Sequence, residues 1–185
     1  MMQTVNIKNM VCNRCKTVVH QIFNAEGFQV LSIELGKVVI EENNNNDFIN
    51  VEKALEKEGF ELIKESSEAL TEKIKITLIK HIDKNDTNYI LSELANELGK
   101  TYSFLSKSFS KTEGITLEKY FISLKIEKVK EYIQLNQLNF SEIAYSLNYN
   151  NSSHLAKQFK NSTGITMTDY KKLQTWNRKS LDQIV

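Results

Sequence analysis

Residues 92–120 read SELANELGKTYSFLSKSFSKTEGITLEKY, and a similar sequence follows at residues 141–170, SEIAYSLNYNNSSHLAKQFKNSTGITMTDY. The offset between the two is 49 residues over their first blocks and 50 over their second blocks. One residue has therefore been added between the two blocks of the second copy. A repeat of this kind predicts two copies of one helical unit.

Each copy has the pattern of two short helices that cross closely. A small residue, Ala95 or Ala144, stands at the centre of the first helix, where a larger side chain would keep the helices apart. The first helix is expected to end at Gly99 in one copy and at Asn148 in the other, since these residue types best tolerate the left-handed backbone of a tight turn. The pattern is that of a helix-turn-helix unit.

The second helix of each copy has an inward and an outward face. Leu105 and Phe109, like Leu155 and Phe159, are spaced i and i+4 and therefore point together into a core. Hydroxyl and amide groups on the opposite face can bind base edges, and lysines there can neutralise phosphates. The alternative is a solvated helix face. The candidate DNA-contacting residues are Tyr102, Ser103, Ser106, Lys107 and Lys111 in the first copy and Asn151, Ser152, His154, Lys157 and Lys160 in the second.

Residues 88–172 resemble the AraC/XylS family of transcription regulators. Three stretches carry the resemblance: LSELANELGKTYSFLSKSFSK, EKYFISLKIEKVKEYI and FSEIAYSLNYNNSSHLAKQFKNSTGITMTDYKK. The resemblance implies two helix-turn-helix subdomains, joined by a linker helix, that enter successive major-groove segments of double-stranded DNA about 34 Å apart. The family usually has Gly where Asn148 stands and Pro where Met167 stands.

Residues 1–65 follow a different pattern. Val5 and Ile7 alternate with polar residues as in a half-buried strand, and the apolar residues after the cysteines recur at helical spacing up to Gly27. A hairpin around Gly36-Lys37, a polar loop and helix cap at Asn43 to Asp47, a helix that ends at Gly59 and a last strand complete the segment. The predicted order is β-α-β-β-α-β, the ferredoxin-like arrangement.

The chain has two cysteines, Cys12 and Cys15, which fall where the first strand ends and the first helix begins. Two sulfurs there can converge on one ion, and the helix amides, together with Arg14 and Lys16, are expected to lower the thiol pKa. Copper(I) accepts two thiolates, whereas zinc usually requires four ligands. The pattern therefore predicts a site for copper(I), or for another thiophilic ion, with Met10 nearby. His20 is expected to face elsewhere on the helix.

The segment from Gln3 to Ile63 resembles the heavy-metal-associated domain of copper chaperones and copper-transporting ATPases. The family signature is Gly-Met-Thr-Cys-x-x-Cys, and residues 9–15 read NMVCNRC, so that Asn9 and Val11 depart from it. The Gly59-Phe60 pair also matches, and in many such domains it lies close to the metal loop. A thioredoxin-like redox pair would require a cis-proline, and the chain has no proline. A purely structural pair of cysteines is the other alternative.

The predicted fold class is α+β. A ferredoxin-like heavy-metal-associated domain (1–65) is followed by a linker (66–73), an all-α double helix-turn-helix domain with a linker helix (74–175) and a C-terminal tail (176–185). Residues 1–72 carry a net charge of −5 and residues 73–185 one of +6, so the second part favours polyanions. No apolar run approaches the roughly 20 residues of a membrane-spanning helix, and no signal peptide is apparent. A cytoplasmic location is expected.

These observations predict a bacterial-type, metal-responsive transcription regulator that binds specific DNA sequences and controls metal export or handling genes. No catalytic constellation occurs, so the chain is not expected to be an enzyme. A homodimer bridged by a shared ion and contacts with RNA polymerase are further expectations. The alternative function is a constitutive DNA-binding regulator whose N-terminal domain exchanges metal with a partner protein or docks onto one.

Overall fold

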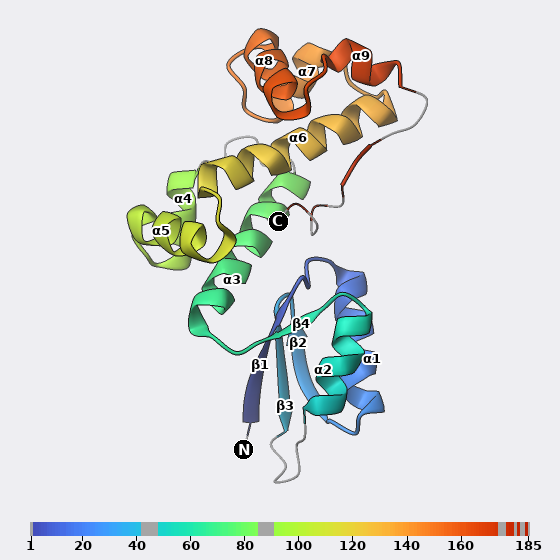
Figure 1. Ribbon diagram of the computed structural model, residues 1–185, viewed down its shortest axis with the longest axis vertical. Coiled ribbons are helices and arrows are strands. Elements are labelled where there is room, and N and C mark those ends of the chain that lie inside the picture. Colours follow the sequence, from blue (N-terminus) through green and yellow to red (C-terminus); the bar gives the residue numbers. More distant parts are fainter. Residues whose placement is uncertain are drawn as a thin grey trace. The chain divides into compact units, whose positions relative to one another are not determined.

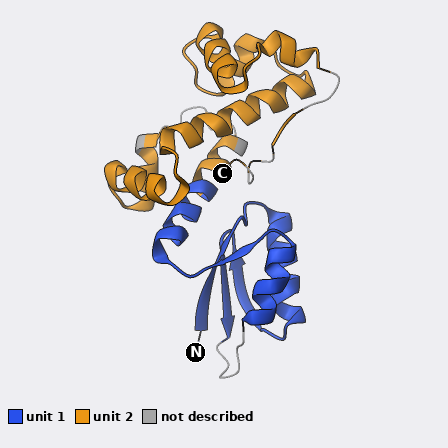
Figure 2. Ribbon diagram, in the orientation of Figure 1, with its two compact units in different colours: residues 1–76 blue, residues 77–185 orange. Residues whose placement is uncertain are grey.

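The computed structural model describes residues 2–41, 48–84, 91–173, 177–179, 181 and 184. The chain forms two compact units, residues 1–76 and residues 77–185 (Figure 2). The polar loop and helix cap predicted at residues 43–47 lie outside the described residues, as does part of the tail predicted from residue 176.

The first unit is built around a four-stranded antiparallel sheet. Its strands are β1 (Met2–Lys8), β2 (Val30–Glu34), β3 (Lys37–Glu41) and β4 (Glu61–Ile63), in the spatial order β2-β3-β1-β4. The helices α1 (Asn13–Ala25) and α2 (Ile49–Lys57) lie on the same side of the sheet (Figure 1). The order of elements, strand-helix-strand-strand-helix-strand, is the predicted one.

The core of this unit lies between the sheet and the two helices. Val5 and Ile7 point into it from β1, as their alternation predicts, and Val38 lies opposite Val5 on β3. α1 contributes Val19 and Phe23, both fully buried. On β1 the positions before, between and after its two core residues are polar: Thr4, Asn6 and Lys8.

The segment predicted to be a linker, residues 66–73, is instead the beginning of a long helix, α3 (Ser66–Asp83). The division between the two units falls inside this helix, after Ile76. The segment has no Gly or Pro to stop a helix, and two of its polar residues, Thr71 and Glu72, are buried. Its polar composition indicated a linker because one partner of Glu72, the backbone N–H of Asn9, lies far away in the sequence.

In the second unit the described residues after α3 form six helices, which repeat one pattern at the two ends of α6 (Leu117–Leu135) (Figure 1). At its start lie α4 (Leu91–Leu98) and α5 (Tyr102–Glu113). At its other end lie α7 (Phe140–Ser146), α8 (Ser152–Thr163) and the short α9 (Met167–Lys171). The predicted pair of helix-turn-helix units and the connecting helix are therefore present.

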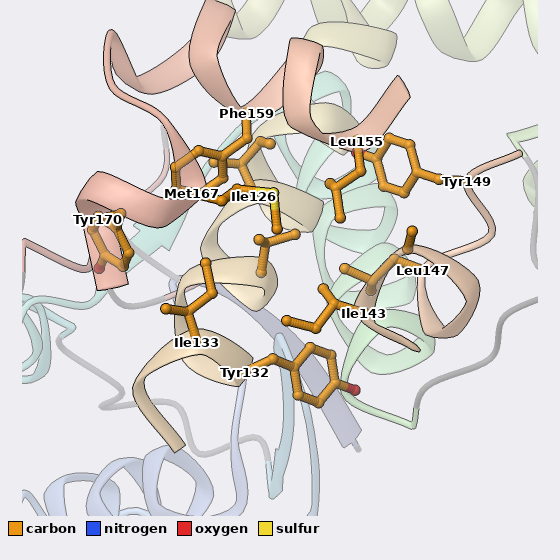
Figure 3. Packing of buried hydrophobic residues seen from close by; sticks show 12 residues of the cluster. Ile126, Tyr132, Ile133, Ile143, Leu147, Tyr149, Leu155, Phe159, Met167 and Tyr170 are labelled. Atoms are coloured by element: carbon orange, nitrogen blue, oxygen red, sulfur yellow. The ribbon is translucent and has the colours of Figure 1, made fainter. Parts of the chain in front are cut away.

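The core of the second helix-turn-helix unit is a cluster of buried residues from α6, α7, α8 and α9. Leu155 and Phe159 enter it from α8, Ile143 from α7 and Tyr170 from α9, and their side chains converge in Figure 3. The Tyr170 ring meets the Phe159 ring edge-on, with ring centroids 5.6 Å apart. In the first copy, Phe109 and Tyr120 form the equivalent pair at 5.1 Å. The two copies of the sequence repeat thus form hydrophobic cores with an equivalent aromatic pair.

Both helix-turn-helix turns use a left-handed residue at the predicted place. Gly99 has φ +62° and Asn148 has φ +55°. Asn148 is exposed, so its conformation rather than its packing decides which residue fits. Lys125 of α6 also donates a hydrogen bond of 3.0 Å to the carbonyl of Leu147, directly before the turn.

The turn supplies a first prediction. Asn148→Ala is expected to destabilise the second unit by about 1 kcal/mol, because a β-carbon without the local hydrogen bonding of asparagine disfavours the left-handed region. Asn148→Gly is the matched control and should cost nothing, since glycine adopts this conformation freely. Urea unfolding followed by circular dichroism gives both values. Equal stability of the two variants would contradict the role assigned to the turn.

Candidate DNA-reading helices and cysteine site

α5 and α8 present the predicted inward and outward faces. Leu105, Phe109, Leu155 and Phe159 are all fully buried. Among the predicted DNA-contacting residues, the exposed ones are Ser103, Lys107, Lys111, Asn151, His154, Lys157 and Lys160, whereas Tyr102, Ser106 and Ser152 are half-buried. Most of the predicted residues therefore stand on surface that a DNA groove can reach.

Tyr102 is already engaged within the protein. Its hydroxyl donates a hydrogen bond to the Glu118 carboxylate at the start of α6. Burial, and then this bond, raise the pKa of Tyr102 to about 12, and the same bond lowers the pKa of Glu118. The phenol therefore stays protonated and ties α5 to α6. This contact gives Tyr102 a structural role beside the predicted DNA contact.

Asn151 and His154 are linked at the start of α8. Asn151 is the N-cap, and its side-chain oxygen accepts a hydrogen bond of 2.8 Å from the backbone N–H of His154. The amide donors of Asn151 stay directed away from this bond. The His154 ring lies edge-on to Tyr149, with centroids 5.6 Å apart. Both side chains are thus held in place at the exposed end of the reading helix.

Two exposed residues in the first turns of these helices were not predicted from the sequence. Phe104 occupies in the first copy the position of His154 in the second, and its side chain is 51% exposed. Ser153 occupies the position of Ser103 and is also exposed. Comparing the copies position by position at the offset of 50 residues would have identified both.

The two cysteine sulfurs lie together at the start of α1. Cys12 is the N-cap of the helix, and its Sγ accepts a hydrogen bond of 3.4 Å from the Cys15 backbone N–H. The two Sγ atoms are 3.0 Å apart and form no disulfide. Cys12 is exposed and Cys15 is half-buried, so the pair can be reached from solvent.

The pKa of Cys15 differs from the sequence-based prediction. Helix amides and neighbouring cations were expected to lower it, but burial, and then the hydrogen bond with Cys12, raise it above the usual value. Hydrogen bonds from backbone groups lower it by a smaller amount. Burial of the sulfur outweighs the helix terminus here, because a thiolate loses more solvation than a thiol. A metal ion at this site must therefore displace a proton.

Asn9 holds the loop before the cysteines in shape. It has φ +68°, a left-handed conformation in which asparagine replaces the glycine of the family signature. Its side-chain amide donates a hydrogen bond of 2.9 Å to the carbonyl of Gly59. The Gly59-Phe60 segment therefore lies beside the cysteine loop, as the resemblance implies.

Neither of the two side chains considered as further ligands completes the site. Met10 is fully buried in the hydrophobic core, so its thioether supports the loop from inside. The Nδ1 atom of His20 lies 3.1 Å from the Asn24 amide on the outer face of α1. Within the described residues, no group of three or more His, Cys, Asp or Glu side chains is placed to hold a metal ion. Two adjacent thiols suit a soft ion of low coordination number and not a tetrahedral zinc site within one chain.

Comparison with known proteins agrees with the double helix-turn-helix fold. The family profile described as "Helix-turn-helix domain" matches residues 94–173. The sequence is 30% identical over 115 residues to the "Uncharacterized HTH-type transcriptional regulator in cgkA 5'region" of Pseudoalteromonas carrageenovora, an alignment that covers 58% of this chain and 68% of that protein. It is also 23% identical over 96 residues to the transposon Tn10 TetD protein of Escherichia coli, covering 52% and 70%.

A solved structure shows the same fold. The C-terminal domain of AraT, a response regulator from Geobacillus stearothermophilus, matches with a TM-score of 0.52 at 19% identity and covers 60% of this chain and 90% of that domain. The fold and the reading helices define a DNA-binding transcription regulator. The chain belongs to the AraC-type helix-turn-helix family, which consists of regulators and not enzymes, as predicted.

Among the described residues, no helix combines the length and the apolar composition needed to cross a lipid bilayer.

Proposed function

We propose that the chain is a metal-responsive transcription regulator in which copper(I), or another thiophilic ion, binds Cys12 and Cys15 and changes DNA binding. The observation that carries this proposal is the pair of Sγ atoms 3.0 Å apart at the start of α1, in a chain that also carries two DNA-reading helices. The regulated genes would serve metal export or handling.

The first unit supports this proposal as a ferredoxin-like, heavy-metal-associated domain. Its element order and its sheet order, β2-β3-β1-β4, agree with that arrangement. The contact of Asn9 with Gly59 places the Gly-Phe segment beside the cysteine loop. When bound, the ion would supply a cross-link between the two thiolates, and Cys12, being exposed, could share it with a second chain. A homodimer is one way in which metal could change DNA binding.

On the DNA side, the exposed lysines of α5 and α8 support binding to two adjacent major-groove segments. Lys107 and Lys157 occupy equivalent positions in the two copies, and both are exposed. The hydroxyl of Ser103 and the imidazole of His154 lie on the same helices and can reach base edges. RNA polymerase would be recruited by surfaces that these helices leave uncovered.

The test is DNA binding by the full chain with and without copper(I), under anaerobic conditions. Fluorescence anisotropy with the DNA upstream of the chain's own gene gives Kd for the wild type and for Cys12→Ser/Cys15→Ser. Copper(I) is expected to change the wild-type Kd by about five-fold or more, a usual size for coupling between two sites. The double variant should bind the same DNA and ignore copper(I).

His20→Ala is the matched control, because it removes another side chain able to bind copper from the exposed face of α1 and should leave the response intact. A wild-type Kd that ignores both copper(I) and the cysteines would support the alternative, in which the first unit is a docking or metal-exchange module. Size-exclusion chromatography of the same samples shows whether copper(I) produces a dimer.

A further inference from the structure

A buried acid lies next to the cysteine loop. The side chain of Glu72, in the first half of α3, is only 4% exposed. Its Oε2 accepts a hydrogen bond of 3.0 Å from the backbone N–H of Asn9. Its Oε1 lies 3.2 Å from Lys75 Nζ, itself 7% exposed, which neutralises the carboxylate. Burying such a pair is costly, so it gives little stability by itself and calls for another explanation.

Asn9 contacts both this acid and Cys15. Its N–H bonds to Glu72, while its carbonyl lies 4.0 Å from Cys15 Sγ, at the limit of a weak S–H···O hydrogen bond. Its side chain is held by Gly59, and its backbone is in a left-handed conformation with φ +68°. Asn9 therefore contacts the Cys15 sulfur through its carbonyl and the Glu72 carboxylate through its N–H.

α3 also touches the first unit at a second place. Gly36, in the turn between β2 and β3, accepts a hydrogen bond of 3.0 Å from Ile7 through its carbonyl. A β-carbon at Gly36 would lie 2.7 Å from the Ile76 side chain, so this turn packs directly against α3. The part of α3 that belongs to the first unit, residues 66–76, is thus held by both the cysteine loop and the hairpin.

The second half of the same helix belongs to the DNA-binding unit. Leu78, Ile79 and Ile82 are buried there. His81 Nε2 lies 3.1 Å from the Glu97 carboxylate, which stands on α4, the first helix of the first helix-turn-helix unit. α3 continues without interruption from Ser66 to Asp83, so it is held by cysteine-loop contacts in one half and by α4 in the other.

We propose that Glu72 is a positioning residue that ties the cysteine loop to α3, and that α3 carries metal occupancy of Cys12 and Cys15 to the first helix-turn-helix unit. This inference rests on the proposed function and specifies its regulation. An ion held by both sulfurs replaces their mutual contact and the weak contact of Cys15 with Asn9. The buried Glu72 cannot exchange its hydrogen bond for water, so α3 responds instead.

The main test removes the hydrogen bond between Glu72 and Asn9 and keeps α3 packed. Glu72→Met/Lys75→Met replaces both buried charges with apolar side chains of similar length, which avoids leaving one charge unpaired. Without metal, faster alkylation of Cys15 by iodoacetamide and faster amide hydrogen exchange at Asn9 are expected. With copper(I), the change in DNA affinity should fall from about five-fold or more to less than about two-fold.

A second variant acts at the other end of α3. Glu97→Gln removes the carboxylate that His81 contacts. The side chain of Glu97 is 47% exposed, so the fold should persist. It should reduce the response to copper(I) and leave Cys15 alkylation at the wild-type rate. Glu61→Gln is the matched control, because it breaks an exposed ion pair with Lys8, the neighbour of Asn9. It should behave as the wild type in every assay.

The outcomes separate this inference from the proposed function. If copper(I) leaves wild-type DNA binding unchanged, the proposed function fails. The metal-free rates at Cys15 and Asn9 then still decide the positioning role of Glu72, and rates unchanged in the Met/Met variant would overturn it. If the wild type responds to copper(I), and the Met/Met variant and Glu97→Gln respond equally well, the transmission through α3 is overturned. Should the Met/Met variant fail to fold, Glu97→Gln still decides the transmission through α3.

Discussion

Phe159→Ala is expected to destabilise the second helix-turn-helix unit by about 3–5 kcal/mol, the usual range for truncating a buried phenylalanine. Phe159 is fully buried, belongs to the cluster drawn in Figure 3 and contacts Tyr170 edge-on. The loss approaches the whole stability of a small domain, which is about 5–15 kcal/mol. The variant should retain most of the structure of the first copy and lose the second.

Two measurements check this expectation. Amide hydrogen exchange should show loss of protection in α7 and α8, with α1 and the sheet unchanged. DNA affinity should drop sharply, because only one reading helix remains. Asn161→Ala is the matched control, since Asn161 lies on the same helix and is exposed. Phe109→Ala should produce the corresponding effect in the first copy. Full protection of α8 in Phe159→Ala would contradict the core described here.

The second large effect is expected from Lys107 and Lys157. Each exposed lysine that neutralises a phosphate releases about one counterion, so its loss lowers DNA affinity about ten-fold near 0.1 M salt. Lys107→Ala and Lys157→Ala should each reduce the slope of log K against log salt by about one, and the double variant by about two. A salt titration of DNA binding by anisotropy measures both quantities.

The sequence repeat predicts effects of similar size for the two lysine substitutions. Because the two lysines occupy equivalent positions on α5 and α8, their effects should be similar in size and close to additive. Lys57→Ala is the control, since it removes the same charge from an exposed site on α2 in the first unit. It should leave the slope unchanged. An equal loss from Lys57→Ala would mean that net charge, and not position on the reading helices, governs binding.

The sequence predicted the features that depend on local pattern. The repeat located both helix-turn-helix units, and Gly99 and Asn148 marked turns that are left-handed in the structure. Alternation at Val5 and Ile7 identified the core-facing side of β1. Each of these signals lies within a few residues of the feature that it predicts, because backbone conformation and helical periodicity are local properties.

The features that depend on distant partners could not be predicted. The hydrogen bond between Asn9 and Glu72 joins residues 63 apart, so the polar segment around Glu72 was interpreted as a linker. The pKa of Cys15 was expected to be lowered because its neighbours in sequence are cationic, whereas burial by the fold raises it. Met10 stands beside the cysteines in sequence, yet its side chain points into the core. Tertiary packing decides all three cases.

α6 has a consequence for any search for binding sites in a genome. It runs for 19 residues, about 28 Å at 1.5 Å per residue, with no interior break, and it packs against both helix-turn-helix units. A continuous helix of this length holds the two helix-turn-helix units at a fixed separation. Inserting one base pair between two half-sites would turn the second by about 35° around the duplex. Two DNA half-sites that are bound by both helix-turn-helix units should therefore be separated by a fixed number of base pairs. A genome search should use a position matrix without variable gaps.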